Sequence, residues 1–149
     1  MRLMKIILAA VVLSFTPIAA SADSISRSDV TRILSGKGYA VQEFTANSIK
    51  VNVGGYAVLV FVAGADSDIS FLHFVSGVRG GDLSYEFLNE FNNEVKFGRA
   101  YVDNDGDVAL QMDRNATGGI SAANIESDFD VFLSLISKFL SDLESQAVV

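Results

Sequence analysis

The chain has 149 residues, of which 18 are acidic and 11 basic, giving a formal net charge of −7, and it contains no cysteine. An acidic surface repels phosphate backbones and anionic lipid headgroups, so the composition argues against binding to nucleic acid and to a membrane surface. The absence of cysteine excludes disulfides, thiolate metal sites and a lipid-modified cysteine. Because His73 is the single histidine, the chain cannot build a histidine-rich zinc site.

The first 22 residues are typical of a secretory signal peptide. Arg2 and Lys5 make a positive start, the apolar run "IILAAVVLSF" follows, and Ala20 and Ala22 have the A-x-A spacing that a signal peptidase reads. The apolar run is shorter than the roughly 18 residues of a membrane span, so we expect cleavage after Ala22 rather than an uncleaved anchor. The expected mature chain, residues 23–149, is a single domain in the periplasm or secreted, with nine basic and eighteen acidic residues and a net charge of −9.

The residues after the signal predict a short helix followed by strands. Ser26 with Asp29 three residues later forms a capping-box pattern, and Gly36 and Gly38 are suited to end the helix. Four strand-like runs follow, separated by short turns: "YAVQEF", "IKVNV", "YAVLVFVA" and "ISFLHFVS". Strands joined by such short turns pair antiparallel, and the third run, apolar on both faces, is expected near the centre of the sheet.

The second half of the chain predicts a helix, a hairpin and a long helix. Leucine and phenylalanine recur at helical spacing in "LSYEFLNEFNNE", and residues 98–103 and 108–113 are expected to pair as a hairpin. The last helix is predicted to begin at Ser121, and its apolar stripe comprises Ile125, Phe129, Phe132, Leu133, Ile136, Phe139, Leu140 and Leu143. An antiparallel sheet packed by an N-terminal, a middle and a long C-terminal helix makes the fold class α+β.

The stretch "YVDNDGDVALQ" has the acidic look of a calcium-binding loop. An EF-hand loop has acids at positions 1, 3 and 5, glycine at 6 and glutamate at 12. With Gly106 at position 6, positions 1 and 12 are Tyr101 and Met112, so the first ligand and the bidentate ligand are missing. The weak candidates for a cation site are Asp103, Asp105 and Asp107.

A tight turn explains the same stretch better. A three-residue loop closed by Asp103 and Asp107 places Val102 opposite Val108, which makes one face of the hairpin continuously apolar. Gly106 then takes the left-handed conformation as a bulge. We therefore predict a structural turn.

Three other positions have a structural and a functional interpretation. His73 lies inside an apolar strand, so we predict a packed, hydrogen-bonded residue, with a catalytic base as the alternative. Arg79 in "GVRGGD" is either an anion contact or part of a flexible loop. Asn89 and Asn92 lie in the predicted middle helix, and Asn89 sits mid-helix, where asparagine is a poor helix former; we predict that its amide ties down a neighbouring loop, with direct ligand contact as the alternative. No catalytic residue is singled out.

The segment "LNEFNNEVKFGRAYVDNDGDVALQMD" resembles the hallmark of the YbjN domain family: a helix ending in an asparagine–aromatic–asparagine pattern, a short link to a Gly-Arg-Ala strand, and an acidic hairpin. The motif residues are Asn89, Phe91, Asn92, Gly98, Arg99 and Gly106. "VTRILSGKGYAV" and "GGISAANIESDFDVFLSLISKFLSDL" resemble the family's first and last helices, so the resemblance extends from about Ser26 to Leu143.

The resemblance implies a fold like that of the type III secretion chaperones, with the order helix, three strands, helix, two strands, helix. The residues predict four strands in the first block, so either "YAVQEF" is a short edge strand or "ISFLHFVS" is an addition. Members of the family are described as sensory-transduction regulators, without established catalysis, cofactor or catalytic residues. The predicted signal peptide sets this chain apart from the family's cytosolic members.

These observations favour a non-catalytic binding or regulatory module of the periplasm, with no cofactor. We expect it to engage a protein or peptide through its sheet and its long last helix, in one variant as a homodimer, without contact to nucleic acid or membrane. Two alternatives remain: a sensor that responds to a cation or a small ligand, and a small hydrolase that uses its carboxylates.

Overall fold

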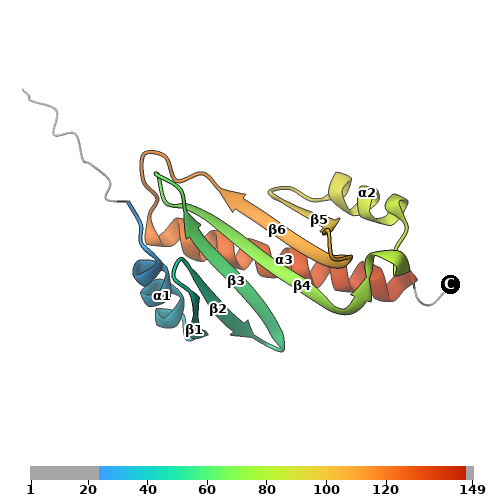
Figure 1. Cartoon of the computed structure of the whole chain (residues 1–149), viewed down its shortest axis with the longest axis horizontal. Helices are drawn as coiled ribbons and strands as arrows, with labels where there is room; N and C mark the ends of the chain where they lie inside the picture. The colour runs from blue at the N-terminus through green and yellow to red at the C-terminus, as the bar shows by residue number, and fades with distance from the viewer. Residues whose placement is uncertain (1–23, 147–149) are drawn as a thin grey trace, which may run out of the picture.

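The computed structural model describes residues 24–146, so the predicted signal peptide and its cleavage site lie outside the described residues. Within this range the chain forms three α-helices, one short 3-10 helix and six strands (Figure 1). In chain order they are α1 (Arg27–Gly36), β1 (Ala40–Thr45), β2 (Ser48–Val53), β3 (Tyr56–Ala63), β4 (Asp68–Arg79), η1 (Gly80–Asp82), α2 (Tyr85–Glu94), β5 (Gly98–Val102), β6 (Asp107–Arg114) and α3 (Ala122–Gln146). The predicted α+β class is confirmed.

The six strands form one antiparallel sheet in the order β1-β2-β3-β4-β6-β5. The first four follow chain order because short turns connect them, whereas the chain leaves β4 through α2 and returns so that β6 pairs with β4 and β5 becomes an edge. The run "YAVQEF" forms β1 at the opposite edge, and "ISFLHFVS" lies in the middle of the sheet as part of β4. The first explanation of the extra strand, a short edge strand, is therefore correct.

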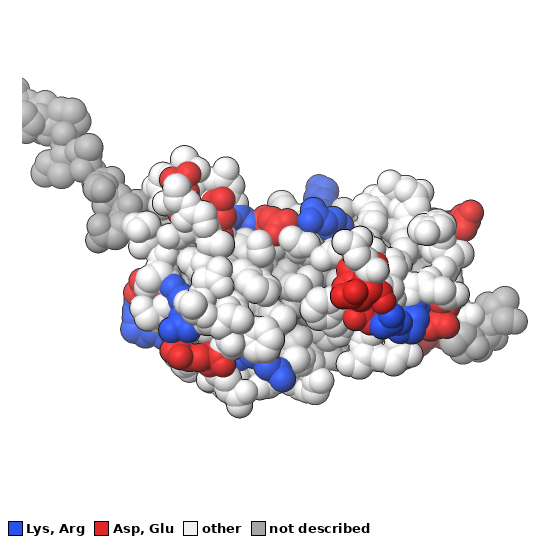
Figure 2. Space-filling model, viewed as in Figure 1, with Lys and Arg blue, Asp and Glu red and all other residues white. Residues whose placement is uncertain are grey.

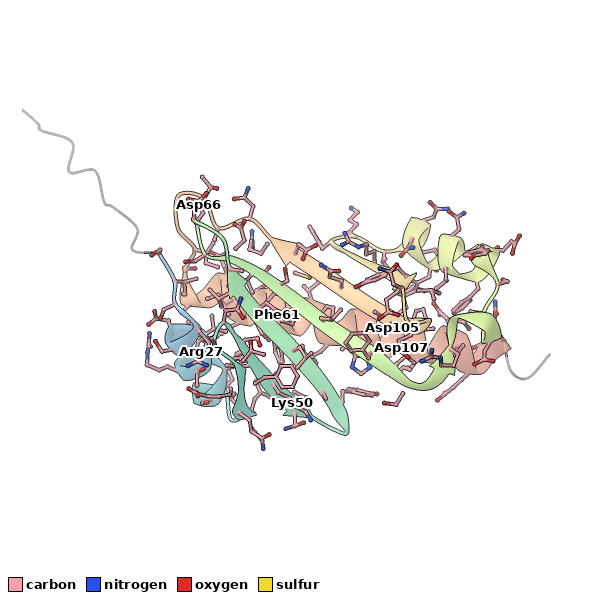
Figure 3. All side chains as sticks on the ribbon, viewed as in Figure 1. Arg27, Lys50, Phe61, Asp66, Asp105 and Asp107 are labelled. Atoms are coloured by element: carbon pink, nitrogen blue, oxygen red, sulfur yellow. The ribbon has the colours of Figure 1, made fainter. Side chains whose placement is uncertain are left out.

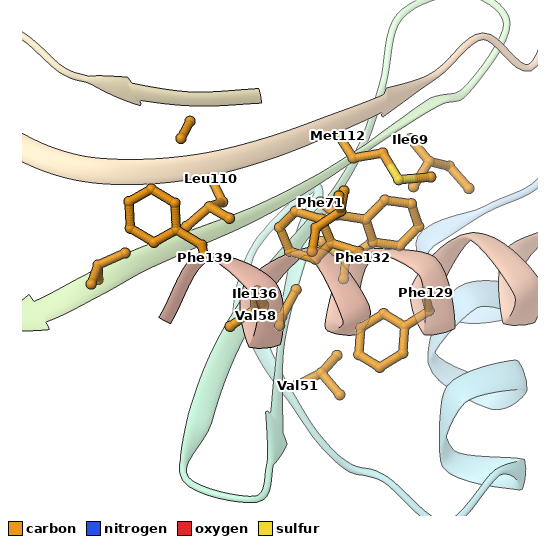
Figure 4. Packing of buried hydrophobic residues seen from close by; sticks show 14 of the residues in the cluster. Val51, Val58, Ile69, Phe71, Leu110, Met112, Phe129, Phe132, Ile136 and Phe139 are labelled. Carbon is orange, nitrogen blue, oxygen red and sulfur yellow. The ribbon is translucent and has the colours of Figure 1, made fainter. Parts of the chain in front are cut away.

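The long helix α3 packs along one face of the sheet (Figure 1), and its phenylalanines form the centre of the core (Figure 4). The ring of Phe71 in β4 lies 6.0 Å from that of Phe129 and 5.8 Å from that of Phe132, between centroids. The predicted stripe is correct except near Leu135, which is buried while Leu133 is only partly so. Gly98 in β5 has no side chain, so α3 can approach this strand closely and Leu135 packs against it.

The predicted helix starts are confirmed. The Ser26 hydroxyl accepts a hydrogen bond from the Asp29 amide (3.2 Å), and the Asp29 carboxylate accepts one from the Ser26 amide (3.1 Å), which completes the capping box of α1. At α3 the Ser121 hydroxyl accepts a hydrogen bond from the Asn124 amide at 3.1 Å. Each cap satisfies an amide that would otherwise lack an intrahelical partner.

The segment "GVRGGD" is regular structure, not a flexible loop. β4 continues through it to Arg79, three residues beyond the predicted end of the strand, and η1 follows. Gly77 has φ +79°, and the pairing of β4 with β6 is interrupted between Phe74 and Arg79. A glycine bulge thus bends the strand and lets it resume pairing, where the sequence suggests only a break. Among the helices described, none is long and apolar enough to cross a membrane.

Candidate functional site

The acidic hairpin adopts the predicted register. Val102 pairs with Val108, the Asp103 amide donates to the Asp107 carbonyl at 2.9 Å, and the Gly106 amide donates to the Asp103 carbonyl at 3.1 Å. Gly106 has φ +81°, the left-handed conformation that a three-residue loop requires. The prediction of a tight turn is confirmed.

The aspartates of this loop are engaged by the chain itself. The Asp103 carboxylate accepts hydrogen bonds from the amides of Asp105 (2.9 Å) and Asp107 (2.8 Å). The guanidinium of Arg79 binds the Asp107 carboxylate and the Asp105 carbonyl, at one end of the sheet (Figure 3). Arg79 therefore contacts an anionic group, but this group is the Asp107 carboxylate of the same chain and not a ligand. Within residues 24–146 no three histidine, aspartate or glutamate side chains gather in a way that could hold a metal ion.

His73 is a core residue, as predicted. It lies on the helix-covered face of β4, its side chain is 6% exposed, and its Nδ1 lies 2.9 Å from the Ala57 carbonyl oxygen. The Tyr56 ring meets the imidazole edge-on at 5.8 Å between centroids. Burial lowers the pKa of His73 below its ordinary value, against the opposing effect of the Ala57 carbonyl. The neutral imidazole lies just beyond the last β3–β4 pair, Leu59 with Leu72, and is enclosed there rather than facing an open cleft.

Of the two helix asparagines, it is Asn92 and not Asn89 that makes a tie, and the tie holds strand β5 rather than a loop. Its amide nitrogen donates to the Ala100 carbonyl at 3.0 Å, and its carbonyl oxygen accepts from the Ala100 amide at 2.8 Å. Asn89, for which the prediction was argued, lies on the exposed side of α2. The helix-propensity argument selected the wrong residue, because it ignores which of the two side chains faces the neighbouring strand.

Two of the remaining motif residues, Phe91 and Gly98, pack the α2–β5 corner against α3. Phe91 is buried and meets Phe139 of α3 edge-on at 5.0 Å between centroids. Gly98 admits close packing, since an added Cβ would lie 2.5 Å from a Leu135 methyl. Arg99 points to the other face of the sheet, where it contacts the Asp113 carboxylate at 3.6 Å and lies over the Tyr101 ring. Phe91 and Gly98 thus support the packing of α3, and Arg99 contacts the neighbouring strand β6 on the opposite face.

The face of the sheet opposite α3 is not covered by any described element. Strand alternation sends one set of side chains into the core and the other set to this outer face. The apolar members of the outer set are Ala57, Leu59, Phe61, Leu72, Phe74, Ala109 and Tyr101, and we call them the outer apolar face. Phe74 is 40% exposed, although it is a large aromatic residue.

Charges surround the outer apolar face rather than interrupting it. Figure 2 shows uncharged surface over β3 and β4 and charged groups towards the margins. Lys50 lies beside Leu59 on the adjacent strand, Phe61 lies on the open side of β3, and Asp105 marks the hairpin end (Figure 3). An apolar centre with a polar rim is the usual anatomy of a protein–protein interface.

A second feature, a cleft of about 360 Å³ between β6 and α3, was missed by the sequence reasoning. Its wall holds an ion pair: Arg114 Nε lies 2.7 Å from Asp128 Oδ2, and Arg114 Nη2 lies 2.9 Å from Oδ1. The hydrogen bonds to Asp128 raise the pKa of Arg114. Two signals could have found the pair, because Arg114 continues the inward alternation of Met112 and Asp128 lies within the apolar stripe beside Phe129.

A sequence model of the YbjN family, described as "Putative bacterial sensory transduction regulator", matches residues 26–145. The chain belongs to the YbjN family. No curated protein matches the chain. The crystal structure of YbjN from E. coli superposes with a TM-score of 0.68 at 16% sequence identity, covering 85% of this chain and 96% of that one.

The type III secretion chaperone SycH of Yersinia pestis, solved in complex with a stable fragment of YscM2, superposes with a TM-score of 0.55 at 15% identity, covering 77% of this chain and 97% of that one. At these identities the two structures establish the fold alone. This YbjN-family chain therefore has the chaperone-like α+β fold that the resemblance implied.

Proposed function

We propose that this protein is a non-catalytic regulator of the periplasm that binds another protein through its outer apolar face. The observation that carries the proposal is the uncovered row of large side chains on β3 and β4, exemplified by Phe61 and Phe74. Transfer of such side chains out of water contributes about 25 cal/mol per Å² of apolar surface, and part of this gain offsets the entropy lost on association. Exposed apolar patches rimmed by polar groups mark interaction sites.

The sheet, rather than the long helix, supplies this surface. The apolar stripe of α3 is used in the core, and its solvent side is lined by polar residues such as Ser127, Ser134 and Ser141. The sequence suggested the sheet and the long last helix as surfaces for a partner. Of these two, only the sheet has an apolar face that is not used in the core. SycH, which shares the fold, was solved with a protein fragment bound, and this is consistent with a protein partner here.

The placement of the reactive side chains supports binding rather than catalysis. The carboxylates of Asp103 and Asp107 are engaged by loop amides and by Arg79, and the imidazole of His73 is enclosed in the core. The periplasmic location is supported by the signal-peptide pattern at the start of the sequence.

Site-specific photocrosslinking in the native host tests the proposal. A photoreactive phenylalanine analogue is placed at Leu72, on the outer apolar face, and for comparison at Ser134, on the solvent side of α3. We expect one recurrent heterologous protein to crosslink at Leu72 and not at Ser134, in the periplasmic fraction. The identified partner should bind the Phe74→Asp variant at least about tenfold more weakly, because a charge is then buried at the interface, while the variant melts cooperatively.

Two results would overturn the proposal. Crosslinks to the chain itself alone would indicate a homodimer, and no crosslink at Leu72 would leave the outer apolar face without a partner. N-terminal sequencing of the protein from cell fractions checks the location separately, and an intact Met1 in the cytoplasm would refute it.

A further inference from the structure

The cleft between β6 and α3 has a mostly apolar lining with one built-in polar pair. Phe97, Met112 and Val131 supply apolar side chains, and Arg114 with Asp128 supplies the polar pair. Its volume of about 360 Å³ corresponds to roughly a dozen water molecules at about 30 Å³ each. Ligand sites in proteins have volumes of about 300–1,000 Å³ and combine an apolar lining with a few placed polar groups. The cleft therefore suits a small molecule rather than a segment of another protein.

Phe97 lines this cleft in an unfavourable backbone conformation. Its φ is +71°, in the left-handed region, which costs free energy for a bulky residue. The side chain gains little in return, because it is 75% exposed. Glycine at this position would make the same turn between α2 and β5 without that cost. Nothing in the described part of the chain offsets the cost of phenylalanine here, whereas a flat apolar molecule against the ring would bury it.

Arg114 has hydrogen-bond donors to spare. A guanidinium carries five N–H groups, and two of them donate to the Asp128 carboxylate at 2.7 and 2.9 Å. Among residues 24–146 no acceptor binds the other three, and the side chain of Arg114 is 36% exposed. The bidentate pair with Asp128 fixes the orientation of the guanidinium before any ligand arrives. A ligand oxygen in the cleft would therefore meet a donor that is already in position.

The charges at the cleft favour a neutral ligand oxygen over an anionic one. Asp128 neutralises Arg114 in the wall, and a second carboxylate there would be repelled by Asp128. Asp113 also lines the cleft, but strand alternation turns its carboxylate to the outer face, where the Ser70 hydroxyl donates to it at 2.7 Å. Lys96 is exposed and is not part of the lining. The charges of the lining thus leave no net attraction for an anion.

We propose that this cleft binds a small neutral molecule with a flat apolar ring and a carbonyl-type oxygen. The ring lies against Phe97, and the oxygen accepts a hydrogen bond from Arg114. This site is separate from the outer apolar face, because the cleft lies between the sheet and α3, on the opposite side of the sheet. It adds a small-molecule ligand to the protein partner of the proposed function and does not depend on that partner.

A two-dimensional NMR titration of the purified protein, in the form that the cell produces, tests the site. The probe is cinnamamide, a flat ring compound with a neutral amide, and the matched control is cinnamate, which carries a carboxylate instead. We expect cinnamamide to shift the backbone amide signals of Phe97, Ser127 and Val131, but not those of Leu72 and Phe74 on the outer apolar face. Cinnamate should bind at least about fivefold more weakly.

Three variants test the two contacts. Phe97→Gly removes the conformational cost, so it should melt no lower than the natural protein and yet bind cinnamamide at least about fivefold more weakly. Tyr85→Ala removes an aromatic side chain that is 84% exposed and outside the cleft, and it should bind cinnamamide normally. Arg114→Met with Asp128→Leu leaves no unpaired charge but lacks the donor, so it should also bind cinnamamide more weakly.

Other results overturn the proposal. Signal shifts confined to the outer apolar face would show that the ring compound binds the sheet surface and not the cleft. Equal affinity for cinnamamide and cinnamate would refute the preference for a neutral oxygen. Unchanged affinity in Phe97→Gly would show that the ring does not contact the ligand, and a lower melting temperature of this variant would show that the ring serves the fold. No shift at millimolar cinnamamide would mean that the cleft takes no molecule of this class.

Discussion

The side chain of Asn92 pairs with the backbone of Ala100 as a neighbouring strand would. Its two hydrogen bonds, at 3.0 and 2.8 Å, satisfy an amide and a carbonyl on the outer edge of β5. One residue thereby docks α2 on the sheet and closes an edge that would otherwise be free to pair. The asparagine-containing motif of the family thus has, in this chain, a structural role that its position in the helix does not reveal.

We expect Asn92→Ala to lower the free energy of unfolding by about 1–3 kcal/mol, because the partly buried Ala100 groups lose both partners. Asn89→Ala is the matched control: it is one turn earlier on the exposed side of α2 and should change stability by less than about 0.5 kcal/mol. Urea denaturation measures both. Equal effects would show that the pair with Ala100 contributes nothing specific.

Opening the β5 edge should also change association. We expect Asn92→Ala, and not Asn89→Ala, to self-associate at high protein concentration, because β5 then presents the free Ala100 groups to an edge strand of another copy. Sedimentation velocity detects this. A strictly monomeric Asn92→Ala variant would show that α2 alone is enough to block the edge.

The single histidine predicts a pH-dependent stability. Burial lowers the pKa of His73 in the folded protein below the value of about 6.5 expected in the unfolded chain. Between these two values the unfolded state binds more protons, so the stabilisation is complete above about pH 6.5 and is lost as the pH falls towards the folded pKa, by at most about 1.4 kcal/mol per pH unit.

Urea denaturation at pH values between about 7.5 and 5.5 tests this, because other side chains seldom titrate in that range. We expect the free energy of unfolding to fall with pH in the natural protein and to be nearly flat in His73→Gln. The same slope in both proteins would mean that His73 is protonated in place without penalty.

Features made by residues close together in the sequence could be predicted, whereas features made by contacts between distant segments could not. Local signals were sufficient for the capping box at Ser26 and for the hairpin register that pairs Val102 with Val108, because both are decided by residues close in sequence. The alternation along each strand also assigned Phe61 and Phe74 to a face of the sheet. It could not show that no helix covers that face, since coverage depends on where distant elements pack.

Contacts between distant segments were the main omissions. The bulge at Gly77 and the capture of the hairpin by Arg79 require β4 to resume pairing with β6, about thirty residues later in the chain. The pair of Arg114 with Asp128 requires the end of the sheet to meet the start of α3. Each of these residues has a plausible local interpretation, and only the tertiary arrangement selects the one that occurs.

The pair of Arg114 and Asp128 should behave as a coupled unit. Asp128→Ala leaves the partly buried guanidinium without its carboxylate, and we expect a loss of about 1–3 kcal/mol, less than for a fully buried pair because Arg114 is about one-third exposed. Replacing both residues, as Arg114→Met with Asp128→Leu, removes the unpaired charge and should recover much of that loss. A double-mutant cycle by urea denaturation measures the coupling, and strictly additive losses would show that the two side chains act independently.

Calcium provides the last test, because the structure assigns each aspartate of the hairpin a different role. The Asp103 carboxylate holds two loop amides, so Asp103→Ala should lower the free energy of unfolding by about 1–3 kcal/mol, with or without millimolar calcium. Asp105 contributes its carbonyl to Arg79, so Asp105→Ala should change stability by less than about 0.5 kcal/mol. Thermal denaturation in calcium and in chelator checks both variants. A melting temperature that rises with calcium in the natural protein and no longer does so in either variant would instead establish the hairpin as a cation site.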